Sequence, residues 1–151
     1  MPNYIPDALK HFKHEKPNKW QGSPHQHTAP SYGAKQQFSK AESNEPVLGK
    51  ENRKYIQQVL RTFLYCARAV DPTMLVVLSA IASEQASPTK ATMEKVDQFL
   101  DYAASQEHAV LTYKAPVMVL AVHSNASYLS ESKSQSRAGG HFFISKDVYF
   151  P

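Results

Sequence analysis

Cysteine is almost absent from this 151-residue chain, in which Cys66 is the only one. A single cysteine excludes an internal disulfide framework and suits a reducing compartment, so we predict an intracellular protein, either cytoplasmic or nuclear. Because Cys66 falls within an expected helix, we expect it to be buried by packing and unreactive. Long apolar runs are absent too: the longest, Met74 to Leu78, is far too short to span a bilayer. We therefore predict no membrane association.

Glycine is also scarce, with five in the chain, of which only Gly139 and Gly140 are adjacent. No glycine-rich fingerprint or following helix accompanies this pair, so it predicts a bulge or a tight strand entry and not a phosphate-binding loop. Structural zinc sites usually combine cysteine with histidine, and the N-terminal histidines have no cysteine near them. These are His11, His14, His25 and His27. We predict no bound metal and no cofactor.

Proline marks off the first third of the sequence. Six of the ten prolines lie in residues 1–49, among many Lys, His, Gln and Ser residues, which predicts an extended or disordered arm. A short helix from Asp7 to Lys13 fits the spacing of its apolar residues, but Pro17 prevents it from continuing. The aromatic residues that are candidates for docking the arm on another surface are Trp20, Tyr32 and Phe38.

Residues 50–106 predict three helices. The first, Lys50 to Ala69, has the clearest helical periodicity in the chain, with Ile56, Val59, Leu60, Phe63, Leu64 and Ala67 on one face. Asp71 and Pro72 form a strong start signal for the second, Thr73 to Gln85, which is apolar nearly all round and should be central. Ser87 and Pro88 repeat that signal. The third helix should turn Met93, Val96, Phe99, Leu100 and Ala103 inward.

Residues 107–151 change to a strand-like period and predict an incomplete small sheet. Val117 to Val122 has the pattern of a buried strand, Leu129 to Arg137 that of a polar connection, and Gly139 to Ile144 that of a second strand returning beside the first. His123, Ser124 and Asn125 lie between them. A sheet cut off at residue 151 leaves an apolar strand edge, which predicts self-association.

This last stretch resembles the reverse transcriptase and ribonuclease H region of copia-type retrotransposon polyproteins. The matching residues are Leu120 to Ala126, Ser136, Arg137, Gly140, Phe142 and Phe143, and upstream Leu64-Tyr65, Ala67-Arg68, Asp71-Pro72 and Phe99 to Tyr102 follow in the family's order. The resemblance covers roughly residues 60–145. More weakly, Ser31 to Lys35 is similar to the linker between thumb and connection in such elements.

The resemblance implies an α+β fold: a proline-rich extended arm, three helices, and a sheet like the start of a ribonuclease H fold. It also places Asn125 where the family has an aspartate that helps to hold two magnesium ions. An amide brings no negative charge to a dication that prefers carboxylates. The family's other acidic ligands would follow Pro151, and its polymerase motif would precede Met1. We therefore predict a fragment that is catalytically inactive alone.

An enzymatic alternative would need Asn125 to assemble a metal site with acidic residues such as Asp97, Asp101, Glu131 or Asp147. Asp97 and Asp101 are four residues apart on the third expected helix, a spacing that is more typical of a solvated acidic stripe beside Lys90 and Lys95.

For function, we predict that the fragment retains weak RNA/DNA hybrid binding. Lys and Arg outnumber Asp and Glu by 17 to 13, which permits contact with phosphates but equally fits a mildly basic protein. The candidate contacts are Lys50, Arg53, Arg61 and Arg137, against the plain interpretation of a solvated helix face. The alternative function is a helical protein-interaction module, or a self-associating relic without a nucleic-acid function.

Overall fold

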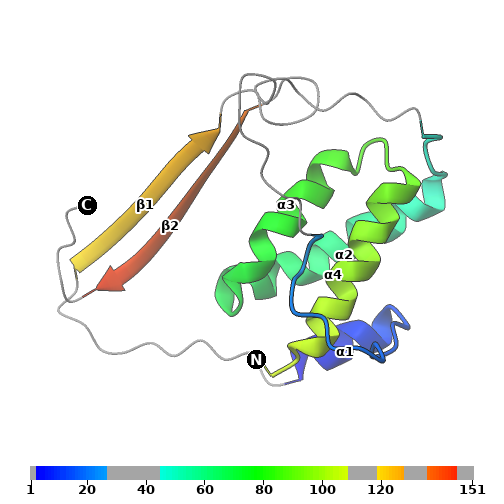
Figure 1. Cartoon of the computed structure of the whole chain (residues 1–151), viewed down its shortest axis with the longest axis horizontal. Coiled ribbons are helices and arrows are strands. Elements are labelled where there is room, and N and C mark those ends of the chain that lie inside the picture. Colours follow the sequence, from blue (N-terminus) through cyan, green and yellow to red (C-terminus); the bar gives the residue numbers. More distant parts are fainter. Residues whose placement is uncertain (1–2, 27–44, 109–118, 128–135, 146–151) are drawn as a thin grey trace. The chain divides into compact units, whose positions relative to one another are not determined.

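The computed structural model of the chain describes residues 3–26, 45–108, 119–127 and 136–145 (Figure 1). The chain divides into two compact units. One holds the helices and comprises residues 1–28 and 45–111, and the other holds a β-hairpin and comprises residues 29–44 and 112–151. The fold class is therefore α+β, as predicted.

The helical unit contains four α-helices among its described residues. They are α1 (Tyr4–His11), α2 (Lys50–Ala69), α3 (Leu75–Glu84) and α4 (Lys90–Ser105), with a 3-10 turn, η2 (Pro72–Met74), leading into α3. The three helices expected within residues 50–106 are confirmed, and α1 overlaps the short helix expected from Asp7 to Lys13 but begins at Tyr4 and ends at His11. No helix among the described residues is long and apolar enough to cross a membrane.

The core of this unit lies where α2, α3 and α4 meet. Phe63 of α2 and Phe99 of α4 are both fully buried, and their rings meet edge to face with centroids 5.0 Å apart. Met74, Leu78 and Ile81 close the core from the side of η2 and α3. Because a buried aromatic side chain removes a large apolar area from water, this contact between distant segments contributes much of the unit's stability.

Helix α3 is less enclosed than its apolar sequence predicts. Val77, Leu78 and Ile81 are buried, but Val76 is 58% exposed and Ser79 also faces solvent. The prediction of a central helix is wrong on this side, because α3 packs on α2 and α4 with one face only. A short helix that contacts two neighbours leaves part of its circumference uncovered even when that part is apolar.

Residues 4–26 differ from the predicted extended arm. Ile5, Ala8 and Leu9 of α1 are buried in the same core as α2 and α4, and the hydroxyl of Tyr4 donates to the carbonyl of Thr62 over 2.7 Å. The proline-rich composition indicates a local preference for extended structure. Burial of an apolar helix face against a larger core outweighs that preference. Tyr32 and Phe38 lie outside the described residues.

Residues 12–26, which we name the strap, run along α4. Gln98, Asp101 and Ser105 contact the strap from successive turns of one face of that helix. Nε2 of His14 lies 2.8 Å from Oδ1 of Asp101, and the backbone N–H of Gln21 donates to the hydroxyl of Ser105 over 3.0 Å. Beyond the helix, Lys16 pairs with Glu107 at 2.9 Å.

Of the aromatic residues expected to dock the arm, Trp20 does not serve as an anchor. Its side chain is 70% exposed, and its ring packs over Gly22 of the strap itself, so closely that a Cβ at Gly22 would lie 2.6 Å from it. The strap is held by hydrogen bonds and ion pairs to α4, and Phe12 is the aromatic side chain that reaches the core, stacking on Phe63 at 6.2 Å.

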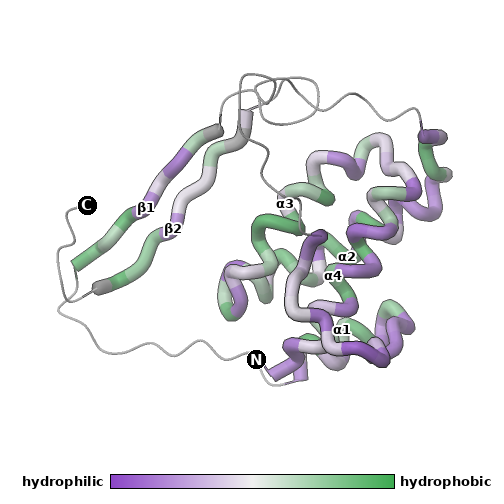
Figure 2. The backbone as a smooth tube through the Cα atoms, viewed as in Figure 1, coloured by the Kyte–Doolittle hydropathy of each residue, from purple (hydrophilic) through white to green (hydrophobic). Residues whose placement is uncertain are grey.

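The second unit contains an antiparallel hairpin of β1 (Val119–Ser127) and β2 (Arg137–Ser145). The predicted return of one strand beside the other is confirmed, with longer strands than expected: His123, Ser124 and Asn125 belong to β1. Figure 2 shows the apolar halves of the two strands side by side at one end of the hairpin. The similarity to the start of a ribonuclease H fold stays a prediction.

The two faces of the hairpin differ in chemistry. Successive residues of a strand point to opposite faces, so the opposed pairs Leu120 with Ile144 and Val122 with Phe142 share one face. These four side chains are between 47% and 67% exposed. The other face carries three stacked rings, with Phe143 centred 5.4 Å from the ring of His123 and 5.0 Å from that of His141.

Candidate nucleic-acid interface

The outer face of α2 carries a row of basic side chains. The row consists of Lys50, Lys54, Arg61 and Arg68, which follow one another at intervals of four, seven and seven residues. Because each residue of an α-helix turns by about 100°, these intervals place all four within about 40° of one another around the helix axis. Phe63 and Val59, which point into the core, lie on the opposite side of the same helix. The helix thus separates an apolar inner face from a basic outer face, which we name the basic stripe.

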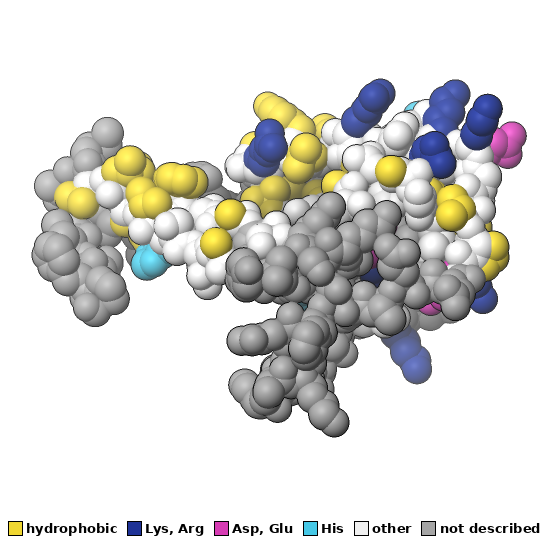
Figure 3. Space-filling view, turned by 90° about the horizontal axis from the view of Figure 1, so that it is seen from above, with side chains coloured by type: hydrophobic (Ala, Val, Ile, Leu, Met, Phe, Trp, Pro, Cys, Tyr) yellow, Lys and Arg dark blue, Asp and Glu magenta, His cyan; other side chains and the backbone are white. Residues whose placement is uncertain are grey.

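All four side chains of the basic stripe belong to exposed residues. Within the described residues none of them forms an ion pair, whereas Lys90 and Lys95 of α4 are both paired with glutamates. Figure 3 shows Lys and Arg side chains standing along one edge of the helical unit. Unpaired cations in a row produce a positive potential that attracts a polyanion.

One aromatic side chain accompanies the basic stripe. Tyr65 is 63% exposed and follows Arg61 by four residues and precedes Arg68 by three, so it is the neighbour of both arginines on the helix surface. An exposed aromatic ring between two guanidinium groups is the combination that proteins use to stack a nucleic-acid base beside its phosphates.

The structure separates the four predicted contact residues. Lys50 and Arg61 lie on the basic stripe, but Arg53 lies at the edge of the core face, where its Nε is buried without a hydrogen-bond partner. Arg137 begins β2, opposite Ser127, and belongs to the hairpin unit. Two of the four predicted residues, Lys50 and Arg61, therefore share one helix face. The other two lie elsewhere, Arg53 at the edge of the core face and Arg137 in the hairpin unit.

Asn125 lies in β1 opposite Gly139 and is exposed. Its side-chain oxygen accepts a hydrogen bond from the backbone N–H of Ala126 over 2.8 Å. Among the described residues no group of three or more His, Cys, Asp or Glu side chains is placed to hold a metal ion. This arrangement does not fit a pair of magnesium ions, which require several carboxylates.

The acidic residues that an enzyme would need lie in the helical unit or outside the described residues, whereas Asn125 belongs to the hairpin unit. Asp97 and Asp101 belong to the helical unit, where Asp101 contacts His14 of the strap. Glu131 and Asp147 lie outside the described residues. The predicted metal-site alternative has no support from the described part of the chain.

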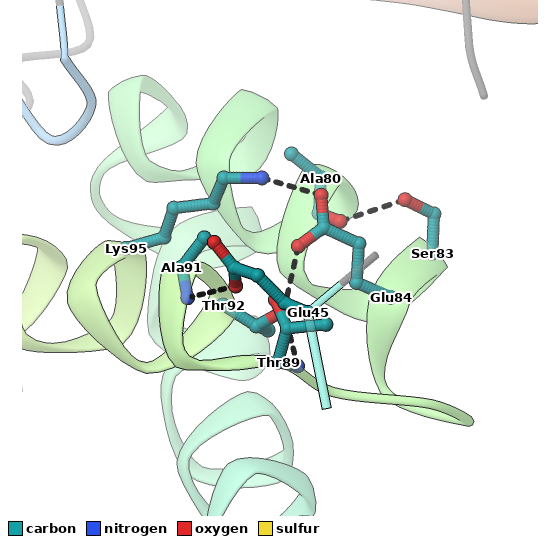
Figure 4. A network of polar contacts seen from close by, with 8 residues as sticks. All are labelled: Glu45, Ala80, Ser83, Glu84, Thr89, Ala91, Thr92 and Lys95. Atoms are coloured by element: carbon teal, nitrogen blue, oxygen red, sulfur yellow. Dashed lines mark hydrogen bonds and ion pairs between the residues drawn. The ribbon is translucent and has the colours of Figure 1, made fainter. Parts of the chain in front are cut away.

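A network of polar contacts joins α3 to α4 and has a structural role (Figure 4). The carboxylate of Glu84 accepts a hydrogen bond from the hydroxyl of Thr92 over 2.9 Å and also pairs with Lys95. Glu45 accepts from the backbone N–H of Ala91 over 3.2 Å in the first turn of α4. Donors at a helix start need acceptors, and these carboxylates supply charge of the favourable sign.

Cys66 is 2% exposed and packs with Phe63 and Ala67 on the inner face of α2, so its predicted burial is confirmed. Burial raises the pKa of the thiol, and the nearby carboxylate of Asp71 raises it further. A thiol whose ionised form is disfavoured is a poor nucleophile, which argues against a catalytic role.

Arg68 and Tyr65 are not predicted from the sequence as part of this surface. Arg68 completes the basic stripe and Tyr65 accompanies it, yet the apolar periodicity that defines α2 indicates only that they lie off its inner face. The spacing of four, seven and seven residues was the available signal, since it marks a single line along a helix. Comparison of the chain with protein-family models, curated proteins and solved structures gives no match.

Proposed function

We propose that this chain is a fragment of a copia-type retrotransposon polyprotein, spanning the reverse transcriptase connection and the start of the ribonuclease H domain. The observation that carries the proposal is the antiparallel hairpin β1–β2, because its two strands and the position of Asn125 within β1 fit the segment order of that family. Within such a parent, this part of the chain would link polymerase to nuclease and contact RNA/DNA hybrids.

The fragment alone is proposed to be catalytically inactive. An amide replaces the expected aspartate at residue 125, and its oxygen is hydrogen-bonded to the next backbone N–H. The family's magnesium ions would supply Lewis-acid chemistry to hybrid cleavage, and this position offers them no charge. We expect no cleavage of a labelled hybrid in magnesium by either the natural chain or Asn125→Asp. Cleavage by the variant would mean that the remaining ligands are present after all.

The retained activity is proposed to be weak, salt-sensitive binding of an RNA/DNA hybrid. The test is fluorescence anisotropy of a labelled blunt hybrid titrated with the full chain in 50 mM and 200 mM salt. Three or four neutralised phosphates predict an affinity that falls by about 50- to 150-fold between the two conditions. The absence of binding at 50 mM, or binding that does not change with salt, would refute hybrid handling.

A second candidate function is self-association through the hairpin. Its first support is the exposed apolar face formed by Leu120, Val122, Phe142 and Ile144. Its second is that the sheet has only two strands among the described residues, so that within this part of the chain each strand has one edge without a partner strand. An isolated two-stranded hairpin is at best marginally stable, and a second copy would supply both a covering face and further strands.

Sedimentation velocity tests this second candidate with a matched pair of variants. Phe142 and Phe143 are adjacent but lie on opposite faces of β2. If the apolar face associates, Phe142→Ser converts the chain to monomer, whereas Phe143→Ser leaves the association largely intact. A natural chain that sediments as a folded monomer over a wide concentration range would remove this candidate.

A further inference from the structure

We propose that the basic stripe and Tyr65 form a binding surface for unpaired nucleotides next to a hybrid. In this proposal Lys50, Lys54, Arg61 and Arg68 contact phosphates spaced along one strand, and the ring of Tyr65 stacks on a base. It rests on the proposed function and deepens it, because it names the surface and the form of nucleic acid that the surface takes.

The length and straightness of the basic stripe match a polynucleotide strand. From Lys50 to Arg68 the helix rises by about 27 Å, the axial length of about eight phosphates of one strand. The charges of the stripe are not neutralised by acidic side chains among the described residues, unlike those of Lys90 and Lys95. A phosphate backbone therefore meets four free cations held in line by a rigid element.

Tyr65 gives the surface its preference for unpaired bases. The face of a base is available for stacking on a side chain only when the base is not sandwiched between its neighbours in a duplex. Tyr65 lies between Arg61 and Arg68 near the C-terminal end of the surface, with most of its side chain exposed. A base that stacks there brings its own phosphates within reach of both guanidinium groups.

An anionic membrane would be the other polyanion to consider, and the helix argues against it. A helix that binds a lipid surface presents a broad apolar face to the membrane with cations at its borders. The broad apolar face of α2 is already buried in the core, with Ile56, Val59 and Phe63 fully enclosed. The part of α2 that remains outside is polar and mostly cationic, and its two large exposed hydrophobic residues are Tyr65 and Leu64, 63% and 36% exposed.

The experiment compares two ligands by anisotropy: a blunt RNA/DNA hybrid and the same hybrid with a ten-nucleotide single-stranded extension. The variants are Arg61→Gln, Arg68→Gln, Tyr65→Ala and Tyr65→Phe in the full chain, with Lys90→Gln as the matched control. Lys90 is also an exposed cation on a helix but is paired with Glu94 at 3.9 Å. Because all of these side chains are exposed, circular dichroism should show the same fold in each variant.

We expect the extension to increase the affinity of the natural chain about tenfold and Tyr65→Ala to abolish that gain, while Tyr65→Phe keeps it. Each arginine substitution should reduce the slope of log affinity against log salt by about one, and Lys90→Gln should leave it unchanged. If the natural chain binds neither ligand, the proposed function itself fails. If it binds but the α2 variants behave like Lys90→Gln, the function stands and this surface is wrong.

Discussion

Cys66 is the only thiol in the chain, and its place on the inner face of α2 makes it a reporter of core opening. Burial raises its pKa, so the native chain offers little thiolate to a reagent. We expect the reaction with a disulfide reagent at pH 8 to be at least about 100-fold slower than for a free thiol. The rate should rise in urea in parallel with the loss of helical dichroism. A fast reaction in the native chain would place Cys66 at the surface.

Asp97 predicts a pH dependence whose sign follows from its surroundings. Partial burial raises the pKa of its carboxyl, His14 lowers it, and the carboxylates of Asp101 and Glu94 raise it, with a net increase. A raised pKa in the folded state means that the native chain binds this proton more tightly than the unfolded chain does. The ionised form therefore disfavours folding, and the stability associated with the protonated form is lost as the pH rises through the folded pKa.

The substitution Asp97→Asn removes that ionisation while keeping the size of the side chain. We expect a higher melting temperature than for the natural chain at pH 7, and a difference that shrinks as the pH falls through the raised folded pKa and is gone below about 3.9, the ordinary aspartate value. Thermal melts followed by circular dichroism at several pH values measure it. An equal or lower melting temperature at pH 7 would show that the His14 attraction outweighs burial.

The 3-10 turn η2, which leads into α3, begins at a cap at Asp71, which the Asp-Pro pair correctly predicts. The Asp71 carboxylate accepts from the backbone N–H of Thr73 over 3.1 Å and from the Thr73 hydroxyl, which lies 2.6 Å from the hydroxyl of Tyr102 in α4. Asp71→Ala should lower the free energy of unfolding by about 1–2 kcal/mol in urea melts. Asp71→Asn keeps an acceptor and should cost less. Equal losses for both variants would mean that charge and not capping matters.

The helices differ in how far the sequence could predict them. Helices α2 and α4 have a long apolar period, which predicts their existence and most of their inner faces, although Leu64, predicted to face inward, is 36% exposed. The start of α4 is at Lys90, with the backbone N–H of Thr89 donating to the hydroxyl of Thr92, and not at the predicted Ser87-Pro88. Both Ser87 and Thr89 are suitable capping residues, so the sequence leaves the first residue of α4 ambiguous. The start at Lys90 is supported by Glu84, which accepts a hydrogen bond from the hydroxyl of Thr92 across the turn between α3 and α4.

The two strands were predictable in kind but not in length. Alternation and apolar runs predict strands from Val117 to Val122 and from Gly139 to Ile144, whereas the polar residues from His123 onward carry no such signal. Their inclusion in β1 is fixed by backbone pairing with β2, with Asn125 opposite Gly139. Pairing of this kind depends on the partner strand, so the position of Asn125 within a strand could not be read from its own neighbours.

At the scale of the molecule, α1 is part of the helical unit and not of a free arm. Leu9 is buried against the same core as Phe63, although an isolated eight-residue helix would be marginal in water. Leu9→Ala should therefore lower the unfolding free energy of the helical unit by about 2 kcal/mol. The adjacent Lys10→Ala, whose native side chain is 81% exposed, should change it by less than about 0.5 kcal/mol.

Urea melts followed by dichroism at 222 nm measure this difference. A Leu9→Ala midpoint equal to that of the natural chain would restore the prediction of a free arm. The sequence could not settle the matter, because the contacts that hold α1 and the strap join residues separated by more than fifty positions, such as Tyr4 with Thr62 and His14 with Asp101. Local composition carries no information about partners so distant.

The exposure of Trp20 has a practical consequence for anyone who follows unfolding optically. It is the only tryptophan in the chain, and it lies on the strap with most of its indole in water. Its emission in the native state is therefore already close to that of a denatured chain. Dissolution of the core around Phe63 and Phe99 would pass with almost no spectral shift, and a sample that had lost its fold would look intact by intrinsic fluorescence.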